Sequence, residues 1–418
     1  MKDEIKKRIE LIEKGQVPEG YKKTKVGIIP EDWKVYKIEE CLRRVANPVE
    51  VEKDREYVQI GIKSHGKGVF YKDPVLGSSL GNKKVYWIEP NCLVLNIVFA
   101  WEQAVGVTTQ AEDGFIGSHR FLMYESINET CLVEYVKYYF LTKEGKNILE
   151  AASPGGAGRN RTLGQERFMK SYVALPSVME QRKIVSILEI MTRNVDITER
   201  LLIQKIKQKE WLTKNLLTGK KRLNSFQGEW KKVKLSDVLK ERKEYSRKGQ
   251  GYKHVTLSKD GIFEKNERYD REHLVKTEDK KYKVTHQNDI CYNPANLKFG
   301  VICKNDFGDA IFSPIYVTFE VKKEYHIEFV SQYLMWNEFI KTVRKYEEGT
   351  VYERMAVNSK DFVKIEIALP PLPEQQAIAQ VLNQADKEIQ LLQQKLDLMK
   401  QEKKAVMQLL LTGIVRVS

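Results

Sequence analysis

The stretch closest to a nucleotide-binding motif is residues 61–68, which read GIKSHGKG. In a phosphate-binding loop, the backbone N–H groups of a glycine-rich turn hold the phosphates and a lysine reaches them. Here Gly68 stands where serine or threonine should bind magnesium, and residues 69–71 (VFY) read as a strand where a helix is required. We interpret the stretch as a hairpin turn, either simply solvated or with its polar side chains facing DNA.

Other catalytic motifs are incomplete. Residues 293–296 (NPAN) lack the second proline and the aromatic residue with which adenine methyltransferases hold a flipped base. The glycines of residues 153–158 (SPGGAG) lack the strand–loop–helix context of a cofactor loop. The six histidines are scattered, and the cysteines show no metal-ligand spacing: Cys41, Cys92, Cys131, Cys291 and Cys303. We therefore expect no catalytic residue, no metal site and no cofactor in this chain.

Polar and basic residues in turn-rich stretches could instead contact nucleic acid. Arg and Asn can pair bidentately with guanine and adenine edges, while Lys mainly contacts phosphate. The candidates in the first half of the chain are Lys63, His65, Lys67, Ser118, His119, Arg120, Arg159 and Arg161. Those in the second half are Ser258, Lys259, Asn296, Lys298, Tyr352 and Arg354. For each of them the alternative is an ordinary solvated side chain.

Composition agrees with a polyanionic partner. The net charge of +14 and the pI near 9.2 favour nucleic acid over a membrane surface. The apolar runs are too short to cross a bilayer, and the charged N-terminus has no apolar signal-peptide core. With 418 residues, 42% of them hydrophobic, the chain can build two or three domains. We expect a cytoplasmic protein with reduced thiols.

The elements that position these residues occur twice. Residues 174–223 and 368–417 align without a gap at an offset of 194, and 14 of the 50 positions are identical. Both copies have Pro near the start and Leu-Leu-Thr-Gly near the end, which are typical helix boundaries. Each copy predicts a helix of roughly 35 to 40 residues, on the order of 55 Å long.

A heptad pattern predicts a coiled coil. In the first copy the apolar seam consists of residues 184, 188, 191, 195, 198, 202, 205, 209, 212 and 216. In the second copy it consists of the residues 194 positions later. Seven of ten seam residues are apolar in the first copy and nine of ten in the second. The partner expected for each helix is the other copy; two unrelated surface helices are the alternative. Lys209 and Lys403 occupy the same seam position in the two copies. A lysine there either fixes the register of the coiled coil or places its ammonium group in solvent.

The globular parts also repeat, with greater divergence. Residues 228–231 (GEWK) echo residues 31–34 (EDWK), and residues 287–290 fall where residues 89–92 do. Strand-like runs such as residues 92–101 (CLVLNIVFAW) alternate with turns, so each part reads as a mostly antiparallel or mixed sheet with short helices. Because the C-terminal LLTGIVRV copies the internal LLTGKKRL, the C-terminus should lie near the start of the first domain, in a pseudo-twofold arrangement.

These features resemble the specificity subunit of Type I restriction–modification systems. The resemblance rests on Leu175, Pro176, Glu180 and Gln181, on their copies Leu369, Pro370, Glu374 and Gln375, and on the two LLTG runs. Residues 20–38 and 117–124 (GSHRFLMY) also look like that family's first domain. The resemblance covers nearly the whole chain.

The resemblance implies a fold and a function. Each globular part would be an α/β target recognition domain that reads half of a split double-stranded DNA sequence. Two long antiparallel helices would join the domains, set the spacing and dock two modification subunits, which methylate adenine. S-adenosylmethionine, ATP and Mg would be expected on those and on the restriction subunits, not on this chain. The positions expected to form the coiled coil or dock subunits are Glu180, Gln181, Leu188, Leu202, Leu216, Glu374, Gln375, Leu382, Leu396 and Leu410.

We therefore predict domains at residues 1–175 and 223–369, each followed by a spacer helix, at 176–222 and 370–418. The predicted function is DNA sequence recognition without catalysis. Three alternatives stay open: a self-contained methyltransferase or nuclease, a coiled-coil scaffold that binds protein, and a specificity subunit of a methylation-only complex. Cofactor binding by the purified chain would favour the first, and salt-dependent DNA binding would argue against the second.

Overall fold

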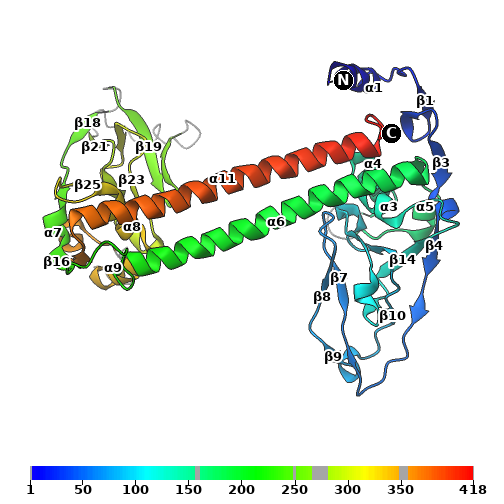
Figure 1. Cartoon of the computed structure of the whole chain (residues 1–418), viewed down its shortest axis with the longest axis horizontal. Helices are drawn as coiled ribbons and strands as arrows, with labels where there is room; N and C mark the ends of the chain where they lie inside the picture. The colour runs from blue at the N-terminus through cyan, green and yellow to red at the C-terminus, as the bar shows by residue number, and fades with distance from the viewer. Residues whose placement is uncertain (1, 156–160, 248–250, 266–280, 348–355, 418) are drawn as a thin grey trace. The chain divides into compact units, whose positions relative to one another are not determined.

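The computed structural model describes residues 2–155, 161–247, 251–265, 281–347 and 356–417. The chain divides into two compact units (Figure 1). Unit 1 contains residues 1–199 and 394–418, and unit 2 contains residues 200–393. Each unit is therefore described by itself.

The core of unit 1 is a four-stranded antiparallel sheet in the order β12-β11-β14-β4. Its strands are β4 (Leu42–Val45), β11 (Leu93–Asn96), β12 (Val105–Val107) and β14 (Phe121–Ser126). The sheet packs on helices α2 (Ile38–Cys41), α3 (Val133–Tyr139), α4 (Lys143–Ala151) and α5 (Gln165–Met169). Fully buried aromatic side chains, among them Tyr124, Phe140 and Phe168, fill the space between.

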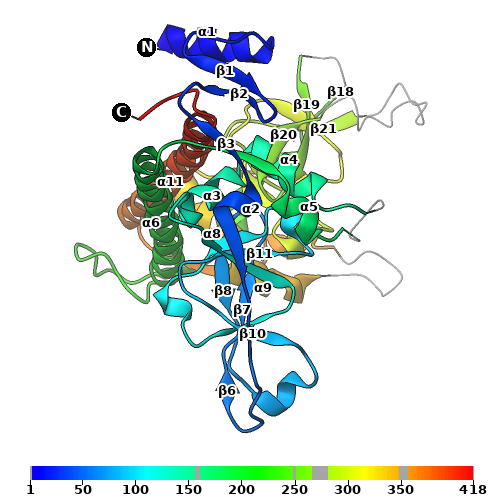
Figure 2. The ribbon, with the colours of Figure 1, turned by 90° about the vertical axis from the view of Figure 1, so that its right-hand side faces the viewer.

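Smaller strand pairs surround this sheet. Strand β3 (Lys34–Lys37) pairs with β15 (Tyr172–Leu175), and β1 (Tyr21–Thr24) pairs with β2 (Gly27–Pro30). Seven further short strands form three small sheets, in the orders β13-β10-β5, β6-β9 and β7-β8. They are β5 (Asn47–Pro48), β6 (Glu56–Tyr57), β7 (Ile60–Ile62), β8 (Val69–Tyr71), β9 (Val75–Leu76), β10 (Val85–Trp87) and β13 (Ile116–Ser118). The N-terminal helix α1 (Lys2–Glu13) lies beside β1 and β2, near the end of the chain (Figure 2).

Unit 2 repeats this plan. Its four-stranded sheet has the order β17-β25-β22-β23, made of β17 (Leu239–Glu241), β22 (Ile290–Tyr292), β23 (Ile302–Lys304) and β25 (Val317–Val321). Helices α7 (Leu235–Val238), α8 (Ile327–Met335), α9 (Asn337–Val343) and α10 (Ser359–Phe362) correspond to α2 to α5, and β16 (Lys231–Lys234) pairs with β26 (Glu366–Leu369). A second sheet contains β18 (Tyr245–Arg247), β19 (Lys253–Ser258), β20 (Gly261–Glu264), β21 (Lys281–Thr285) and β24 (Ala310–Phe312).

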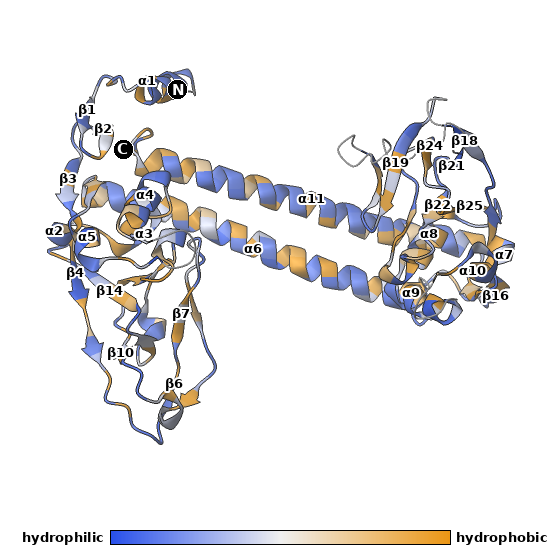
Figure 3. Cartoon of the chain, turned by 180° about the vertical axis from the view of Figure 1, so that it is seen from behind, coloured by the Kyte–Doolittle hydropathy of each residue, from blue (hydrophilic) through white to orange (hydrophobic). Residues whose placement is uncertain are grey.

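The two long helices are α6 (Val178–Leu216) and α11 (Leu372–Leu411), 39 and 40 residues long. Within unit 1 the beginning of α6 packs against the end of α11, and in unit 2 the end of α6 packs against the beginning of α11. The helices are therefore antiparallel in each unit. All twenty predicted seam positions are buried or half-buried, and apolar residues recur along both helices (Figure 3). The predicted fold class, two α/β domains with a pair of long coiled-coil helices, is confirmed.

The matching ends of the two repeats join each helix pair to its domain. In unit 1, Arg416 donates from Nε and Nη2 to the buried Glu180 carboxylate, at 2.7 and 2.8 Å. It also donates to Asp32 and holds the pKa of that carboxyl below its ordinary value. Tyr21 donates its hydroxyl proton to the Gly413 carbonyl at 2.7 Å. The chain's end thus lies at the start of the first domain, as the repeat predicts.

Unit 2 has the same junction, but there it is formed by residues inside the chain and not by the C-terminal residues. Arg222 donates from Nε and Nη2 to the Glu374 carboxylate, at 2.5 and 2.6 Å. In both units the glutamine after this glutamate donates to the proline carbonyl that precedes the helix: Gln181 to Pro176 at 3.0 Å, and Gln375 to Pro370 at 2.9 Å. The Glu-Gln pair therefore serves the same structural purpose twice.

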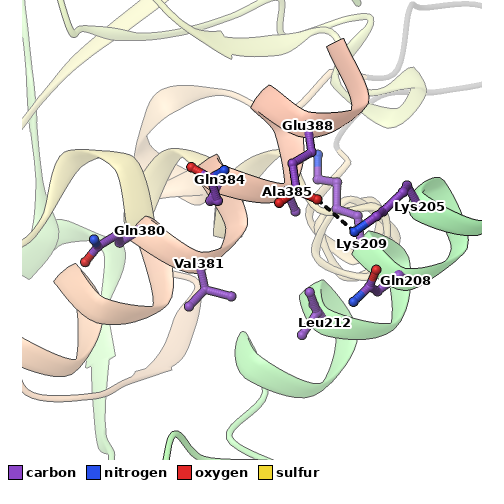
Figure 4. Close-up of a pocket in the computed structure, with 9 residues that line it drawn as sticks. All are labelled: Lys205, Gln208, Lys209, Leu212, Gln380, Val381, Gln384, Ala385 and Glu388. Atoms are coloured by element: carbon purple, nitrogen blue, oxygen red, sulfur yellow. Dashed lines mark hydrogen bonds and ion pairs between the residues drawn. The ribbon is translucent and has the colours of Figure 1, made fainter. Parts of the chain in front are cut away.

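The helix pair differs between the units at its polar seam positions. In unit 2, Lys205 pairs with Glu388 at 2.9 Å, and Lys209 pairs with Asp386. Beside them the two helices line a half-open pocket of about 390 Å³, with the small Ala385 in its wall (Figure 4). In unit 1 the equivalent of Lys205 is Met399, whose sulfur accepts a hydrogen bond from Thr198 at 3.7 Å.

Two details of the sequence interpretation need correction. Strand β11 ends at Asn96, so residues 97–101 (IVFAW) are not strand, because the Asn96 side chain accepts a hydrogen bond from the Val98 N–H. The alignment of residues 287–290 with 89–92 is off by one residue. Asn91 and Asn288, both with positive φ, are the equivalent pair, at an offset of 197. The Asn91 N–H donates to the Thr108 carbonyl directly after β12, and the Asn288 N–H donates to the Asn305 carbonyl directly after β23.

Candidate nucleic-acid interface

The predicted hairpin turn is present between β7 and β8, which pair antiparallel from Ile60↔Tyr71 to Ile62↔Val69. The turn is held in place by a loop that follows β11. His65 N–H donates to the Glu102 carbonyl at 2.8 Å, and the Ser64 hydroxyl donates to the Glu102 carboxylate at 2.9 Å. Lys63, His65 and Lys67 are exposed on this fixed turn.

The same loop gathers the other described candidates of the first domain. The Ile97 N–H donates to the Arg120 carbonyl at 2.9 Å, next to the exposed His119. The Arg161 guanidinium lies 5.4 Å from the centre of the Trp101 ring. Ser118 accepts a hydrogen bond from the Arg120 N–H at 3.3 Å. Residues that are up to 98 positions apart in the sequence thus meet around residues 97–103. Arg159 lies outside the described residues.

In the second domain the described candidates occupy two loops. Ser258 and Lys259 form the turn between β19 and β20, where the Ser258 hydroxyl oxygen accepts from the Asp260 N–H at 3.1 Å. Asn296 is exposed and Lys298 half-buried in the loop that follows β22. Tyr352 and Arg354 lie outside the described residues.

The loops after β11 and β22 have the same backbone structure. We call residues 96–104 loop A and residues 293–301 loop B, at the offset of 197. The side chains of Asn96 and Asn293 each accept from the N–H two residues on, at 3.1 Å in both cases. A 3₁₀ turn follows, Ala100–Glu102 in loop A and Leu297–Phe299 in loop B, and each ends at a left-handed residue, Gln103 (φ 59°) or Gly300 (φ 80°).

Backbone hydrogen bonds repeat as well. The N–H of the fourth residue bonds to the carbonyl of the first at 3.0 Å in both loops, and the first and last residues bond to each other at 3.0 and 3.1 Å. The second residue's carbonyl accepts from a later segment, from Leu163 at 2.8 Å in loop A and from Val357 at 3.2 Å in loop B. Yet Asn is the only identical residue among the nine positions. The units therefore present different side chains on one shared scaffold.

This equivalence reveals residues that the sequence interpretation missed. Phe99 and Trp101 occupy the positions of Asn296 and Lys298, and Glu102 occupies that of Phe299. They were overlooked because residues 92–101 read as one strand. A signal in the sequence could have revealed them. Trp33 and Trp230 are also 197 residues apart, and applying the same offset to residues 96–104 aligns loop A with loop B.

Cations accompany aromatic rings in both loops. Arg161 lies over Trp101 in unit 1, and the Lys298 ammonium lies 5.5 Å from the centre of its neighbouring Phe299 ring in unit 2. Lys298 also pairs with Glu347 at 3.7 Å. Phe299 is 53% exposed. Such a surface combines a positive charge for phosphate with planar and amide groups for base edges.

A charged cluster supports the strand that leads to loop B. Arg242 donates to both oxygens of the buried Asp289 at 2.8 and 2.9 Å. His286 lies between Glu244 at 3.0 Å and Asp309 at 2.9 Å. Burial lowers the pKa of His286, but its hydrogen bonds to the two carboxylates outweigh this and raise the pKa above its ordinary value. Asp289 directly precedes β22, so the cluster lies at the start of the strand that leads to loop B.

The residues expected in the coiled coil or in subunit docking are mostly buried. Leu188, Leu202, Leu216, Leu382, Leu396 and Leu410 lie in the seam, each no more than 6% exposed. Glu180, Gln181, Glu374 and Gln375 are buried in the junctions described above. Which helix residues contact partner subunits stays a prediction. Exposed apolar side chains occur on both helices, among them Ile190 and Leu398 in unit 1 and Ile206 and Leu391 in unit 2.

Among the residues that the structure describes, no group of three or more His, Cys, Asp or Glu side chains is arranged to hold a metal ion. No helix in the described ranges is long and apolar enough to cross a membrane.

Comparisons with known proteins match this architecture. The family model of the Type I restriction modification DNA specificity domain matches residues 30–208 and again residues 227–401. A Methanocaldococcus jannaschii protein described as a type I restriction enzyme MjaX specificity subunit is 22% identical over 440 residues, covering 96% of this chain and 97% of its own.

Two solved structures have a similar fold. The HsdS subunit from Thermoanaerobacter tengcongensis is 17% identical with a TM-score of 0.51, covering 93% of this chain and 98% of that one. The S subunit of a Type I restriction–modification system from M. genitalium is 11% identical with a TM-score of 0.56, covering 90% and 96%.

Proposed function

The chain belongs to the Type I restriction modification DNA specificity family, and from this premise we propose that it reads a split DNA target through its two units. It is a DNA-recognition subunit without a catalytic role. Each unit would contact one half-site in double-stranded DNA, with the bases between the half-sites left unread.

The observation that carries this proposal is the repeated loop. Loops A and B share a backbone and hydrogen bonds but present different side chains. Two copies of one recognition surface with different chemistry suit a target of two different half-sites. In unit 1 the loop is surrounded by Lys63, His65, Arg120 and Arg161, whose charges suit phosphates and guanine edges.

The two long helices would serve the rest of the complex. We propose that their exposed apolar side chains dock two modification subunits, which would carry S-adenosylmethionine and methylate adenine, and that restriction subunits would add ATP- and Mg-dependent cleavage. A pair of helices whose twenty seam positions are buried or half-buried can keep a fixed length while it presents its outer face. A cytoplasmic location is part of the same proposal.

The test is modified-base sequencing of DNA from cells that make this chain with its neighbouring methyltransferase subunit. Cells that make the methyltransferase alone are the control. Adenine methylation at one split motif, only when both chains are present, is the expected result and supplies the half-sites and the spacer. Methylation by this chain alone would make it an enzyme and overturn the proposal.

A second measurement distinguishes DNA recognition from protein scaffolding. The complex should bind DNA with an affinity that falls steeply with salt, because each phosphate contact releases counterions with a slope of roughly 0.9 per contact on a log–log plot. Binding that is insensitive to salt, or absent, would favour a protein-binding scaffold.

A further inference from the structure

Loops A and B divide their nine positions into two kinds. Five positions maintain the loop: the first, Asn96 or Asn293, accepts a hydrogen bond; the second and the ninth accept through their carbonyls; the fifth is fully buried; and the eighth is left-handed. The fifth residue, Ala100 or Leu297, is 0% exposed in either unit. The third and fourth positions contribute backbone hydrogen bonds in both loops, so it is the side chains of the third, fourth, sixth and seventh positions that have no shared structural role.

The remaining positions differ in chemistry between the units. Loop A has Val98, Phe99, Trp101 and Glu102, and loop B has Ala295, Asn296, Lys298 and Phe299. All eight are exposed or half-buried. An amide such as that of Asn296 can pair with adenine, a phenyl ring can contact the thymine methyl group, and a carboxylate can accept from the cytosine amino group. The two sets would therefore favour different bases.

We propose that these four positions in each loop determine which half-site the corresponding unit reads, and that Asn96 and Asn293 are positioning residues that hold the four in place. The inference rests on the proposed function and extends it to named residues. Because the backbones match, one set can be moved onto the other loop without rebuilding it.

The experiment moves the loop A set into loop B. The variant A295V/N296F/K298W/F299E retains Asn293, the buried Leu297 and the left-handed Gly300, so the scaffold keeps its anchor, core and turn. It is produced with the methyltransferase subunit, and the methylated motif is read by modified-base sequencing. Lys323→Ala, an exposed substitution elsewhere in unit 2, is the control and should leave the motif unchanged.

The expected result is a motif in which one half-site changes while the other half-site and the spacer stay as in wild type. An unchanged motif, methylated as efficiently as in wild type, would overturn the proposal. If the variant supports no methylation, its purified complex is used to select duplexes from a library randomised in that half-site. Enrichment of a new half-site supports the inference, and enrichment of the wild-type half-site overturns it.

Failure of the proposed function is recognised separately, because the wild-type complex would then yield no split motif. A single substitution provides finer evidence. Asn296→Ala should relax discrimination at one base position of one half-site by roughly 5- to 150-fold. Equal discrimination at every position would show that Asn296 does not read a base.

The positioning role has its own test. Asn293→Ala removes the acceptor for the Ala295 N–H, whereas Asn293→Asp keeps an oxygen there. We expect the alanine variant to lose discrimination in the half-site read by unit 2 only, and the aspartate variant to recover most of it. Equal discrimination by the alanine variant and wild type would exclude a positioning role. So would equal losses in the two variants, or loss in both half-sites, because these would mark a general loss of folding.

Discussion

The guanidinium of Arg416 and the carboxylate of Glu180 form a bidentate ion pair, 236 residues apart in the sequence. Trp33 supports the same carboxylate through its indole N–H at 3.3 Å. Residues from the first domain, the first helix and the last turn of the chain therefore meet at one carboxylate, which is only 7% exposed.

Replacement of Arg416 should destabilise unit 1. Arg416→Met would leave the Glu180 charge buried without its main partner, and we expect a loss of about 3 kcal/mol in the free energy of unfolding of unit 1. Hydrogen exchange of amides in the first turns of α6 would measure it. Lys400→Ala breaks an exposed pair with Glu199 and should cost less than about 1 kcal/mol. Similar losses in the two variants would contradict the prediction.

The pocket beside Ala385 should accept a larger side chain. The equivalent residue of the first copy is Met191, so Ala385→Met introduces a side chain that the other unit already carries. We expect unit 2 to gain roughly 0.5 to 2 kcal/mol of stability, as cavity-filling changes commonly do. Ala379→Met is the matched control on the same helix, because Ala379 is 0% exposed and overpacking there should cost about 1 to 3 kcal/mol. Denaturant unfolding of the two variants should move in opposite directions.

His286 should make the stability of unit 2 depend on pH. Its pKa is raised in the folded state, since its bonds to Glu244 and Asp309 outweigh the effect of burial. The stabilisation is therefore fully present below the unfolded pKa of about 6.5 and is lost as pH rises through the higher folded value. Hydrogen exchange in β21 and β22, corrected for the intrinsic exchange rate, should show this loss above about pH 6.5. His286→Gln should remove this part of the pH dependence, and an unchanged profile would exclude His286 as its source.

The long helices should set the distance between half-sites. Seven residues inserted between Glu199 and Arg200, together with seven between Gln393 and Gln394, would add two turns to each helix and preserve the seam. This lengthens each helix by about 10.5 Å, close to three base pairs at 3.4 Å. The methylated motif should keep its half-sites and gain about three unread base pairs. Insertion into one helix alone misaligns the seam and should destabilise the pair; altered half-sites in the double insertion would refute the prediction.

The helices were the most predictable part of the molecule. Leu188, Leu202 and Leu216 repeat at heptad spacing, and their copies repeat at a constant offset, so periodicity alone located both helices and the seam. The meeting of the C-terminus with the first domain also followed from the repeat. Such patterns are local and regular, which is why a single sequence reveals them.

The candidate site was only partly predictable. Lys63, His65 and Lys67 were recognised as a hairpin turn, because glycines mark it. Loop A was missed because Ile97, Val98 and Phe99 have strand-forming side chains, while one hydrogen bond that the Asn96 side chain accepts from the Val98 N–H ends the strand. The position of Arg161 over the Trp101 ring depends on tertiary contacts between distant segments, which no local pattern encodes.

The discontinuity of unit 1 has a consequence for biosynthesis. Unit 2 is one continuous stretch, residues 200–393, and its core needs no later residue. The core of unit 1 includes Met407, Leu410 and Leu411, which the ribosome adds about 200 residues after the end of the first domain. At 5 to 20 residues per second this delay is on the order of 10 to 40 s. The first domain to be translated is therefore the last to complete its core, and until residues 407–411 are made it lacks part of its apolar packing.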